Sequence, residues 1–299
     1  MTEPAGPRSG TSVPGRFVEV DGRRIHVVDE GAGPPVLLMA ALGSNWFDLD
    51  PLAARLVARG HRVVRYDRPG YGMSEAPRAH HVPSLDGEID RMLAVLDAVG
   101  VAGSVILVGH SLASLYVEGF ARTRPDRTAG VLILDGSYVL VPWRILPTGV
   151  RVGNAHRAIG LLRTIGRCSG IRPADGAAVR ERVLPRPPEG FDESQRRWAG
   201  RLFGGPSMLL ATLTENAAFP AINAALRRMR HTHPMPEVPT IVLAAVSGPA
   251  VWQRYWCWKQ RRYAADLGAQ FRTVAARHFV VLDRPDEVAE LVGEVGGRT

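Results

Sequence analysis

The sequence of 299 residues has little of several features, and each shortage excludes a class of protein. Its two cysteines, Cys168 and Cys257, lie far apart and outside any CxxC or Cys/His pattern. We therefore expect neither a disulfide framework nor a zinc site, which fits a reducing compartment, although the two cysteines could still pair. The longest apolar run, Val36 to Leu42, is far too short to span a membrane. These shortages predict a cytoplasmic protein without stable membrane insertion.

Lysine is almost absent, because Lys259 is the only one, and arginine supplies the rest of the positive side-chain charge. The net charge is +8, and the segment from Tyr138 to Met235 carries 15 arginines against six acidic residues. Such a segment either attracts anionic substrates, nucleic acid or acidic lipid, or forms a solvated surface. No nucleic-acid-binding motif accompanies the charge, so we expect no nucleic-acid partner.

Apolar runs typical of buried strands alternate with segments of helical periodicity along most of the chain. The expected strands are 16–20, 24–30, 35–41, 62–66, 104–109, 130–134, 240–245 and 271–275. Alternation of this kind predicts an α/β fold with a mostly parallel central sheet of about eight strands, flanked by helices. In such sheets, ligands bind beyond the carboxyl ends of the strands.

The alternation divides the chain into three parts. Residues 1–15 are rich in Pro, Gly, Ser and Thr and predict a flexible N-terminal tail without an apolar signal segment. Residues 16–137 and 237–299 carry the strand and helix alternation and form the predicted core. Residues 138–236 have helical patches but no clear buried strand, which predicts a helical insertion after the sixth strand.

The most specific motif is Gly109-His110-Ser111-Leu112-Ala113, which follows the apolar run Val105 to Val108 and opens a helical segment. A strand, a tight turn and a helix in this order are the context of a nucleophile elbow. The turn holds a serine in a strained backbone conformation and lifts its hydroxyl above the sheet edge, and small residues on either side permit it. The motif predicts that Ser111 is a nucleophile.

With this motif in place, the sequence resembles the α/β-hydrolase superfamily from Gly15 to Gly296. Residues 67–74, Asp-Arg-Pro-Gly-Tyr-Gly-Met-Ser, resemble the family's loop after the fourth strand, and residues 278–285 resemble its catalytic-histidine loop. The resemblance implies that the insertion at 138–236 is the cap. It also implies that His278 is the general base, a role that suits a side chain with a pKa near neutrality. A glycine usually precedes this histidine, whereas Arg277 here could narrow the site or add positive charge.

The resemblance leaves two places for the acid of the triad. The seventh strand, where many members carry an aspartate, ends here without a carboxylate, at residues 243–249. The sixth strand ends at Asp135, so we expect Asp135 to orient His278; the alternative is that Asp135 only caps the chain as it enters the insertion.

The expected oxyanion hole departs from the family pattern. Ala40 and Ala41 stand where the family has His-Gly, and the backbone N–H groups of Leu42 and Leu112 are the implied donors. The loss of glycine matters if that position needs an unusual backbone conformation. One such donor stabilises the transition state by on the order of 3 kcal/mol in comparable enzymes, so this change is the best argument for altered activity.

The resemblance implies a serine esterase or lipase-like hydrolase that cleaves an ester or similar acyl bond in a small, largely apolar molecule, without a metal or organic cofactor. From the cap, Trp143, Trp198 and Phe203 could line the substrate site or could equally be cap core. Acyl transfer, lactone formation, C–C cleavage or a lyase step could use the same triad, and a non-catalytic ligand-binding protein remains a further alternative. Epoxide hydrolase and dehalogenase chemistry are disfavoured, because those relatives place an aspartate where Ser111 stands.

Overall fold

The computed structural model describes residues 14–77, 81–139, 146–169, 176–203 and 206–297. Its centre is an eight-stranded sheet with the order β1-β2-β4-β3-β5-β6-β7-β8. Only the β1–β2 and β2–β4 pairs are antiparallel. The strands are β1 (Arg16–Val20), β2 (Arg23–Glu30), β3 (Pro35–Met39), β4 (Arg62–Tyr66), β5 (Val105–His110), β6 (Thr128–Leu134), β7 (Thr240–Val246) and β8 (Gln270–Ala275). This sheet confirms the predicted α/β fold.

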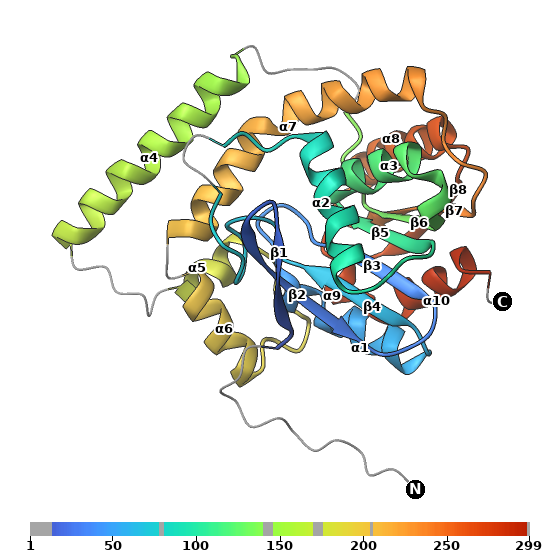
Figure 1. Cartoon of the computed structure of the whole chain (residues 1–299), viewed down its shortest axis with the longest axis horizontal. Helices are drawn as coiled ribbons and strands as arrows, with labels where there is room; N and C mark the ends of the chain where they lie inside the picture. Colours follow the sequence, from blue (N-terminus) through green and yellow to red (C-terminus); the bar gives the residue numbers. More distant parts are fainter. Residues whose placement is uncertain (1–13, 78–80, 140–145, 170–175, 204–205, 298–299) are drawn as a thin grey trace, which may run out of the picture.

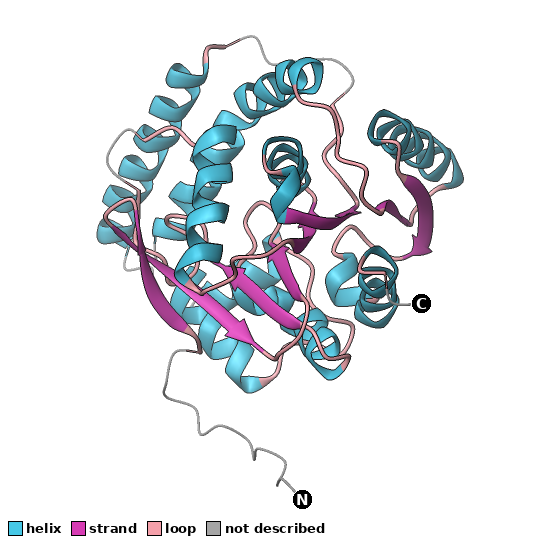
Figure 2. Cartoon of the chain, turned by 45° about the vertical axis from the view of Figure 1, so that its right-hand side comes forward, coloured by secondary structure: helices cyan, strands magenta, loops and turns pink. Residues whose placement is uncertain are grey.

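Helices cover both faces of the sheet, as Figure 2 shows. The helices and 3₁₀ turns outside 138–236 are η1 (Trp46–Leu49), α1 (Asp50–Ala58), α2 (Leu85–Ala98), α3 (Ala113–Thr123), η2 (Pro125–Arg127), α8 (Ala250–Leu267), α9 (Val280–Asp283) and α10 (Pro285–Val295). Alternate residues of the inner strands point to opposite faces. Leu37, Leu107 and Ile133 pack toward α2, α3 and α8, while Leu38 and Val108 pack toward α1, α9 and α10.

The segment between β6 and β7 forms four described helices, α4 (Thr148–Ser169), α5 (Gly176–Val183), α6 (Glu193–Phe203) and α7 (Pro206–Thr232). Figure 1 shows α4, α5 and α6 to one side of the sheet, with the long α7 arching from them toward α3. The second half of α7 buries Ala218, Ile222 and Leu226 in the apolar cluster that covers one face of the sheet. The insertion is therefore fixed to the core through α7.

The third strand ends two residues before the predicted position. β3 stops at Met39, and a tight turn follows in which the Ser44 N–H donates to the Ala41 carbonyl at 3.2 Å. Gly43 supplies the positive φ of this turn, +76°, which only glycine adopts at little cost. We call Ala41–Ser44 the 41–44 turn.

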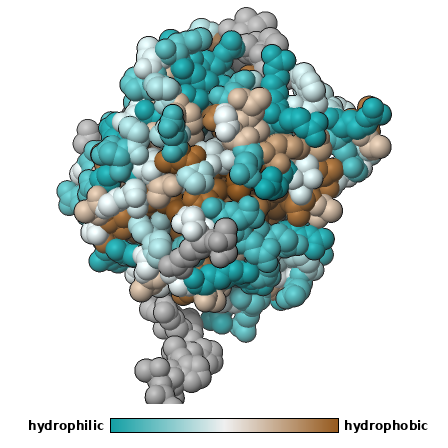
Figure 3. Space-filling view, turned by 90° about the vertical axis from the view of Figure 1, so that its right-hand side faces the viewer, coloured by the Kyte–Doolittle hydropathy of each residue, from teal (hydrophilic) through white to brown (hydrophobic). Residues whose placement is uncertain are grey.

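No helix among the described residues is long and apolar enough to cross a membrane. Figure 3 views the side that carries α8 and α10, where apolar residues reach the surface between larger hydrophilic areas. On α8, the large apolar residues Val251, Trp252, Tyr255 and Trp258 are exposed.

Candidate active site

Ser111 lies in a sharp turn between β5 and α3. Its φ of +55° belongs to the left-handed region, which non-glycine residues rarely adopt and which is a recurrent sign of a functional turn. The Ser111 N–H donates to the Leu134 carbonyl at 2.9 Å, and the Ser137 N–H donates to the Ser111 carbonyl at 3.2 Å. These two bonds fix both sides of the turn to the end of β6 and stabilise the strained conformation of Ser111.

Gly109 makes this turn possible, as its position in the motif predicts. A Cβ on Gly109 would lie 2.5 Å from Cγ2 of Val117 and 2.9 Å from the Ala113 carbonyl oxygen. Both contacts are with the helix that follows the turn, so any larger residue would force α3 away from β5.

Ser111, His278 and Asp135 come together at the carboxyl ends of β5, β6 and β8. His278 Nε2 lies 2.9 Å from Ser111 Oγ, and His278 Nδ1 lies 2.6 Å from Asp135 Oδ2. Asp135 is 3% exposed, whereas the His278 side chain is 44% exposed. The three side chains form one continuous chain of hydrogen bonds in which the histidine faces an open surface and the acid is buried.

The second oxygen of Asp135 has two further partners. Asp135 Oδ1 accepts from the Ala245 N–H at 2.9 Å and from the indole Nε1–H of Trp256 at 2.5 Å. Asp135 itself has a φ of +47°, which turns its side chain from the end of β6 toward β7. Sequence analysis did not identify Trp256; its only signal was a place in the tryptophan-rich stretch of α8.

His110 contacts the loop that carries His278 through a hydrogen bond and a ring contact. His110 Nε2 donates to the His278 carbonyl oxygen at 2.7 Å, and its ring lies edge-on to Phe279 with 5.0 Å between centroids. Burial, and next the proximity of His278, lower the pKa of His110 from 6.5 to about 3. His110 is therefore neutral near pH 7 and acts as a hydrogen-bond donor rather than as a second base.

The positive charge that Arg277 brings next to His278 is paired with a carboxylate. Its side chain pairs with Asp283, its backbone N–H donates to the same carboxylate at 2.8 Å, and Nη2 donates to the Arg186 carbonyl oxygen at 3.0 Å. Burial raises the pKa of Asp283, but the bonds and charge of Arg277 outweigh this and lower the pKa below its usual value. The residue in the family's glycine position thus fixes the histidine loop to the insertion.

The two expected oxyanion donors lie next to the serine and in the 41–44 turn. Leu112 follows Ser111 and is the N-cap of α3, with φ −56° and ψ −38°, where backbone N–H groups have no acceptor within the helix. Leu42 follows Ala41 in the 41–44 turn. Ala41 is not among the described non-glycine residues with positive φ. The replacement of glycine at this position therefore causes no backbone strain.

Of the three aromatic residues expected to line the site, the two that the structure describes, Trp198 and Phe203, are not at the triad. Trp198 packs edge-on against Trp46 with 5.7 Å between ring centroids, and Phe203 joins the cluster of Tyr71, Met208 and Ala211. Both therefore lie in apolar contacts between the insertion and the core, and Trp143 lies outside the described residues.

A groove opens beside the triad where the sequence had indicated none. It has a volume of about 390 Å³ and contains the triad members Asp135 and His278 together with Trp252, Tyr255 and Trp256 of α8. The wall formed by α8 carries the aromatic side chains Trp252, Tyr255 and Trp256, and the groove borders the end of β7, where this chain carries no carboxylate. Among the described residues, no group of three or more His, Cys, Asp or Glu side chains could hold a metal ion.

Comparison with known proteins places these observations in a family context. The model of the alpha/beta hydrolase family matches residues 26–291. Epoxide hydrolase B of Mycobacterium tuberculosis is 33% identical over 124 residues, which cover 39% of this chain and 34% of that protein. Bifunctional epoxide hydrolase 2 of Rattus norvegicus is 29% identical over 130 residues, covering 43% and 23%. The match thus spans about a third or less of these curated relatives.

Solved structures match over far more of the chain. An epoxide hydrolase from Vigna radiata superposes with a TM-score of 0.67 at 20% identity, covering 93% of this chain and 96% of the other. The enol-lactonase from Burkholderia xenovorans superposes with a TM-score of 0.64 at 23% identity, covering 93% and 98%. At these identities the likeness is one of fold.

Proposed function

The chain belongs to the alpha/beta hydrolase family, and from this premise we propose that it is a serine hydrolase in which Ser111 forms an acyl-enzyme. The observation that carries the proposal is the unbroken chain of hydrogen bonds from Ser111 through His278 to Asp135. A serine hydroxyl is a weak nucleophile until a base withdraws its proton, and an acid must fix the tautomer of that base. The strained φ of Ser111 supports the same assignment.

In the proposed reaction, Ser111 Oγ attacks the acyl carbon of the substrate while His278 Nε2 takes the hydroxyl proton. Asp135 keeps the His278 Nδ1 proton in place and stabilises the imidazolium that forms. The N–H groups of Leu42 and Leu112 hold the developing oxyanion. His278 then protonates the leaving group, and a water activated by the same histidine releases the acid and restores Ser111.

The substrate class follows from the groove beside His278. Trp252, Tyr255 and Trp256 offer aromatic surface in a groove that His278 also lines, which suits a small and largely apolar ester or related acyl compound. Residues 138–236 form the cap of the proposed enzyme, and 16–137 with 237–299 form its catalytic core. The reaction requires no metal or organic cofactor.

The activity named for the matched epoxide hydrolases is not carried over. The resemblance places an aspartate at the elbow of those relatives, whereas this chain has the hydroxyl of Ser111 there. The serine therefore favours acyl chemistry, in which the nucleophile and the leaving group are exchanged on a carbonyl carbon.

Labelling with a fluorophosphonate probe tests the proposal directly. We expect one probe per chain, found by intact mass and mapped to Ser111, and no labelling of Ser111→Ala. Ser247→Ala is the matched control, because Ser247 is exposed and lines the groove beside the triad but makes no contact that the mechanism uses. An unlabelled but folded wild-type protein would refute the activated serine.

A further inference from the structure

The 41–44 turn is covered by the cap and enclosed between two buried ion pairs that join the cap to the core. A Cβ on Gly43 would lie 3.6 Å from Cγ2 of Thr212 in α7 and 3.7 Å from Cδ1 of Leu184. Cap side chains therefore lie in direct contact distance of the turn that presents Leu42.

The first ion pair contacts the backbone at the start of the turn. Arg68 donates from Nε and Nη2 to Glu215 Oε1 and Oε2 at 2.8 and 2.9 Å, in the bidentate geometry that makes such pairs strong and directional. Its remaining bonds go to the carbonyl oxygens of Ala40 at 2.7 Å and Ala41 at 3.1 Å. One guanidinium thus connects a glutamate of α7 to the two residues that precede Leu42.

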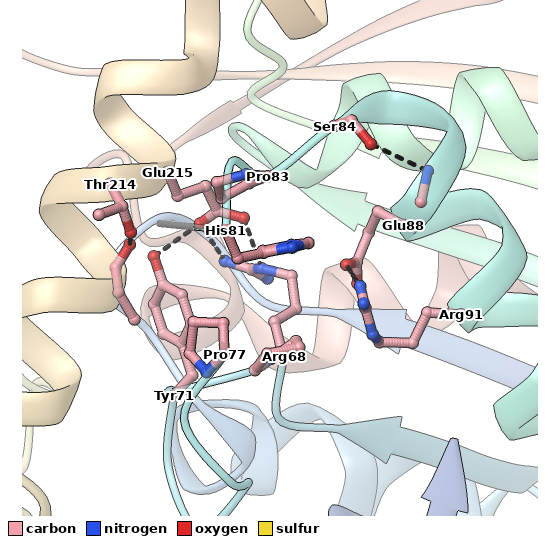
Figure 4. A pocket seen from close by; sticks show the side chains of 13 residues that line it. Arg68, Tyr71, Pro77, His81, Pro83, Ser84, Glu88, Arg91, Thr214 and Glu215 are labelled. Atoms are coloured by element: carbon pink, nitrogen blue, oxygen red, sulfur yellow. Dashed lines mark hydrogen bonds and ion pairs between the residues drawn. The ribbon is translucent and has the colours of Figure 1, made fainter. Parts of the chain in front are cut away.

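Glu215 is held in turn by two tyrosines, as Figure 4 shows for Tyr71. Tyr71 Oη donates to Glu215 Oε2 at 2.6 Å, and Tyr116 Oη donates to Oε1 at 2.9 Å. Burial raises the pKa of both phenols, so they remain donors at neutral pH. Arg68 and Glu215 are 4% and 5% exposed, so neither charge could be solvated by water if the other were removed.

The second ion pair contacts the end of the turn, and here the cap supplies the positive charge and the core supplies the negative charge. Arg180 of α5 pairs with Asp48 of η1, and both side chains are fully buried. Asp48 Oδ2 also accepts from Ser44 Oγ at 2.8 Å and from the Asn45 N–H at 3.2 Å. The last residue of the 41–44 turn is therefore connected to the cap through a single carboxylate.

We propose that the cap positions the oxyanion donor of Leu42 through Glu215 and Arg180, which act as positioning residues for catalysis. The inference rests on the proposed function, because it assigns these residues to the oxyanion hole of that reaction. Displacement of the cap would remove the counter-charges of Arg68 and Asp48 and expose both groups to water, while each stays bonded to the 41–44 turn, so the turn rearranges whenever the cap leaves. The enzyme is then competent only when the cap is seated on the core.

The same arrangement explains how the chain functions with Ala40-Ala41 in place of His-Gly. Arg68 donates to backbone carbonyl oxygens, so these hydrogen bonds do not depend on the side chains at positions 40 and 41. Glu215, which supplies the counter-charge, is the only acidic residue of α7, a helix whose other charged side chains are basic. Glu215 is buried, so its carboxylate does not serve to solvate the surface of α7.

The test compares Glu215→Gln with Ser44→Ala, a milder change that removes only the bond to Asp48. Glu118→Gln is the matched control: Glu118 is also fully buried and holds Arg122 and Arg230, at 2.8 and 2.7 Å, but contacts no part of the 41–44 turn. Hydrogen–deuterium exchange of the peptide that covers 39–48 and ester hydrolysis per fluorophosphonate-titrated serine are both measured.

We expect Glu215→Gln to lower kcat about 10- to 100-fold per titrated serine with little change in KM, because the oxyanion contact forms fully only in the transition state. Ser44→Ala lowers kcat by a smaller factor. Both variants speed exchange in 39–48, whereas Glu118→Gln lowers thermal stability without either effect.

If Glu215→Gln and Ser44→Ala match Glu118→Gln in both readouts, the ion pairs only stabilise the fold and the inference is wrong. The exchange measurement needs no catalysis, so it decides the coupling of cap and turn even if the wild-type serine is not labelled. Absent labelling alone would refute the proposed function, while unchanged exchange in 39–48 would refute the positioning role.

Discussion

The substitution Asp135→Asn gives the sharpest test of the triad, because the structure dictates how the amide would orient. Asp135 Oδ1 accepts two N–H bonds, from Ala245 and Trp256, and these donors require an oxygen at that place. The amide nitrogen of the variant is therefore directed at His278 Nδ1. His278 Nδ1 must then accept a hydrogen bond from the amide, so the ring proton moves to Nε2. The Nε2 atom is then protonated and cannot act as the base for Ser111.

The expected loss follows from this change of tautomer. The equivalent substitution in a serine protease triad lowers kcat about 10⁴-fold, which corresponds to about 5 kcal/mol of transition-state stabilisation. We expect a loss of similar size here in ester hydrolysis and in the rate of fluorophosphonate labelling. The overall shape is retained, because the amide preserves the volume of the side chain and the two bonds to its oxygen.

The control is Asp266→Asn, since Asp266 lies on α8 and accepts from Tyr138 Oη without contacting the triad. Melting temperatures of both variants separate loss of fold from loss of chemistry. A folded Asp135→Asn protein that retains activity within about tenfold of wild type would refute Asp135 as the acid and the reasoning from its hydrogen bonds.

Three further substitutions have defined outcomes. Trp256→Phe removes one charge-assisted bond to Asp135, so kcat/KM for an ester falls about tenfold, in line with roughly 1.5 kcal/mol; an unchanged value would mean the indole is only packing. Gly109→Ala places a Cβ 2.5 Å from Cγ2 of Val117, so the free energy of unfolding falls by roughly 1–3 kcal/mol and the urea midpoint falls with it. An unchanged midpoint would contradict the tight elbow. His110 has a pKa of about 3 in the fold and 6.5 when unfolded, so its contribution to stability is lost as pH falls through that window. The stability of His110→Asn therefore declines less steeply from pH 6 to pH 4 than that of wild type.

The sheet and the serine turn could be predicted because their signals are local. β5 is buried throughout and begins with the apolar run Val105 to Val108, and the small residues and the helix that an elbow needs follow this run at once. Asp135 could be proposed from its place at the end of β6, although sequence alone left a capping role open. The strand alternation that predicted eight strands reflects burial on both faces, and this pattern depends on neighbours only a few residues away.

The contacts that complete the site were beyond sequence reasoning because they join distant segments. Trp256 meets Asp135 across 121 residues, and Arg68 meets Glu215 across 147. The first pair depends on how α8 packs beside the end of β6, and the second depends on where α7 lies on the core; no periodicity in one sequence records either distance. Trp198 illustrates the same limit, since sequence alone left it either in the substrate site or in the core of the insertion, and only the structure shows that it packs against Trp46.

The departure at Ala40-Ala41 bears on activity less than a comparison of motifs indicates. The argument for a damaged oxyanion hole requires that position 41 adopt a conformation that alanine resists, and among the described residues the strained positions are elsewhere, at Ser111, Asp135 and Asp21. Gly43 takes the positive φ of the turn, and Arg68 holds the carbonyl of Ala41. Under the proposed function, the backbone bonds of this segment to a buried arginine replace the role of a glycine, and the geometry of the proposed oxyanion hole then depends on the cap through Glu215.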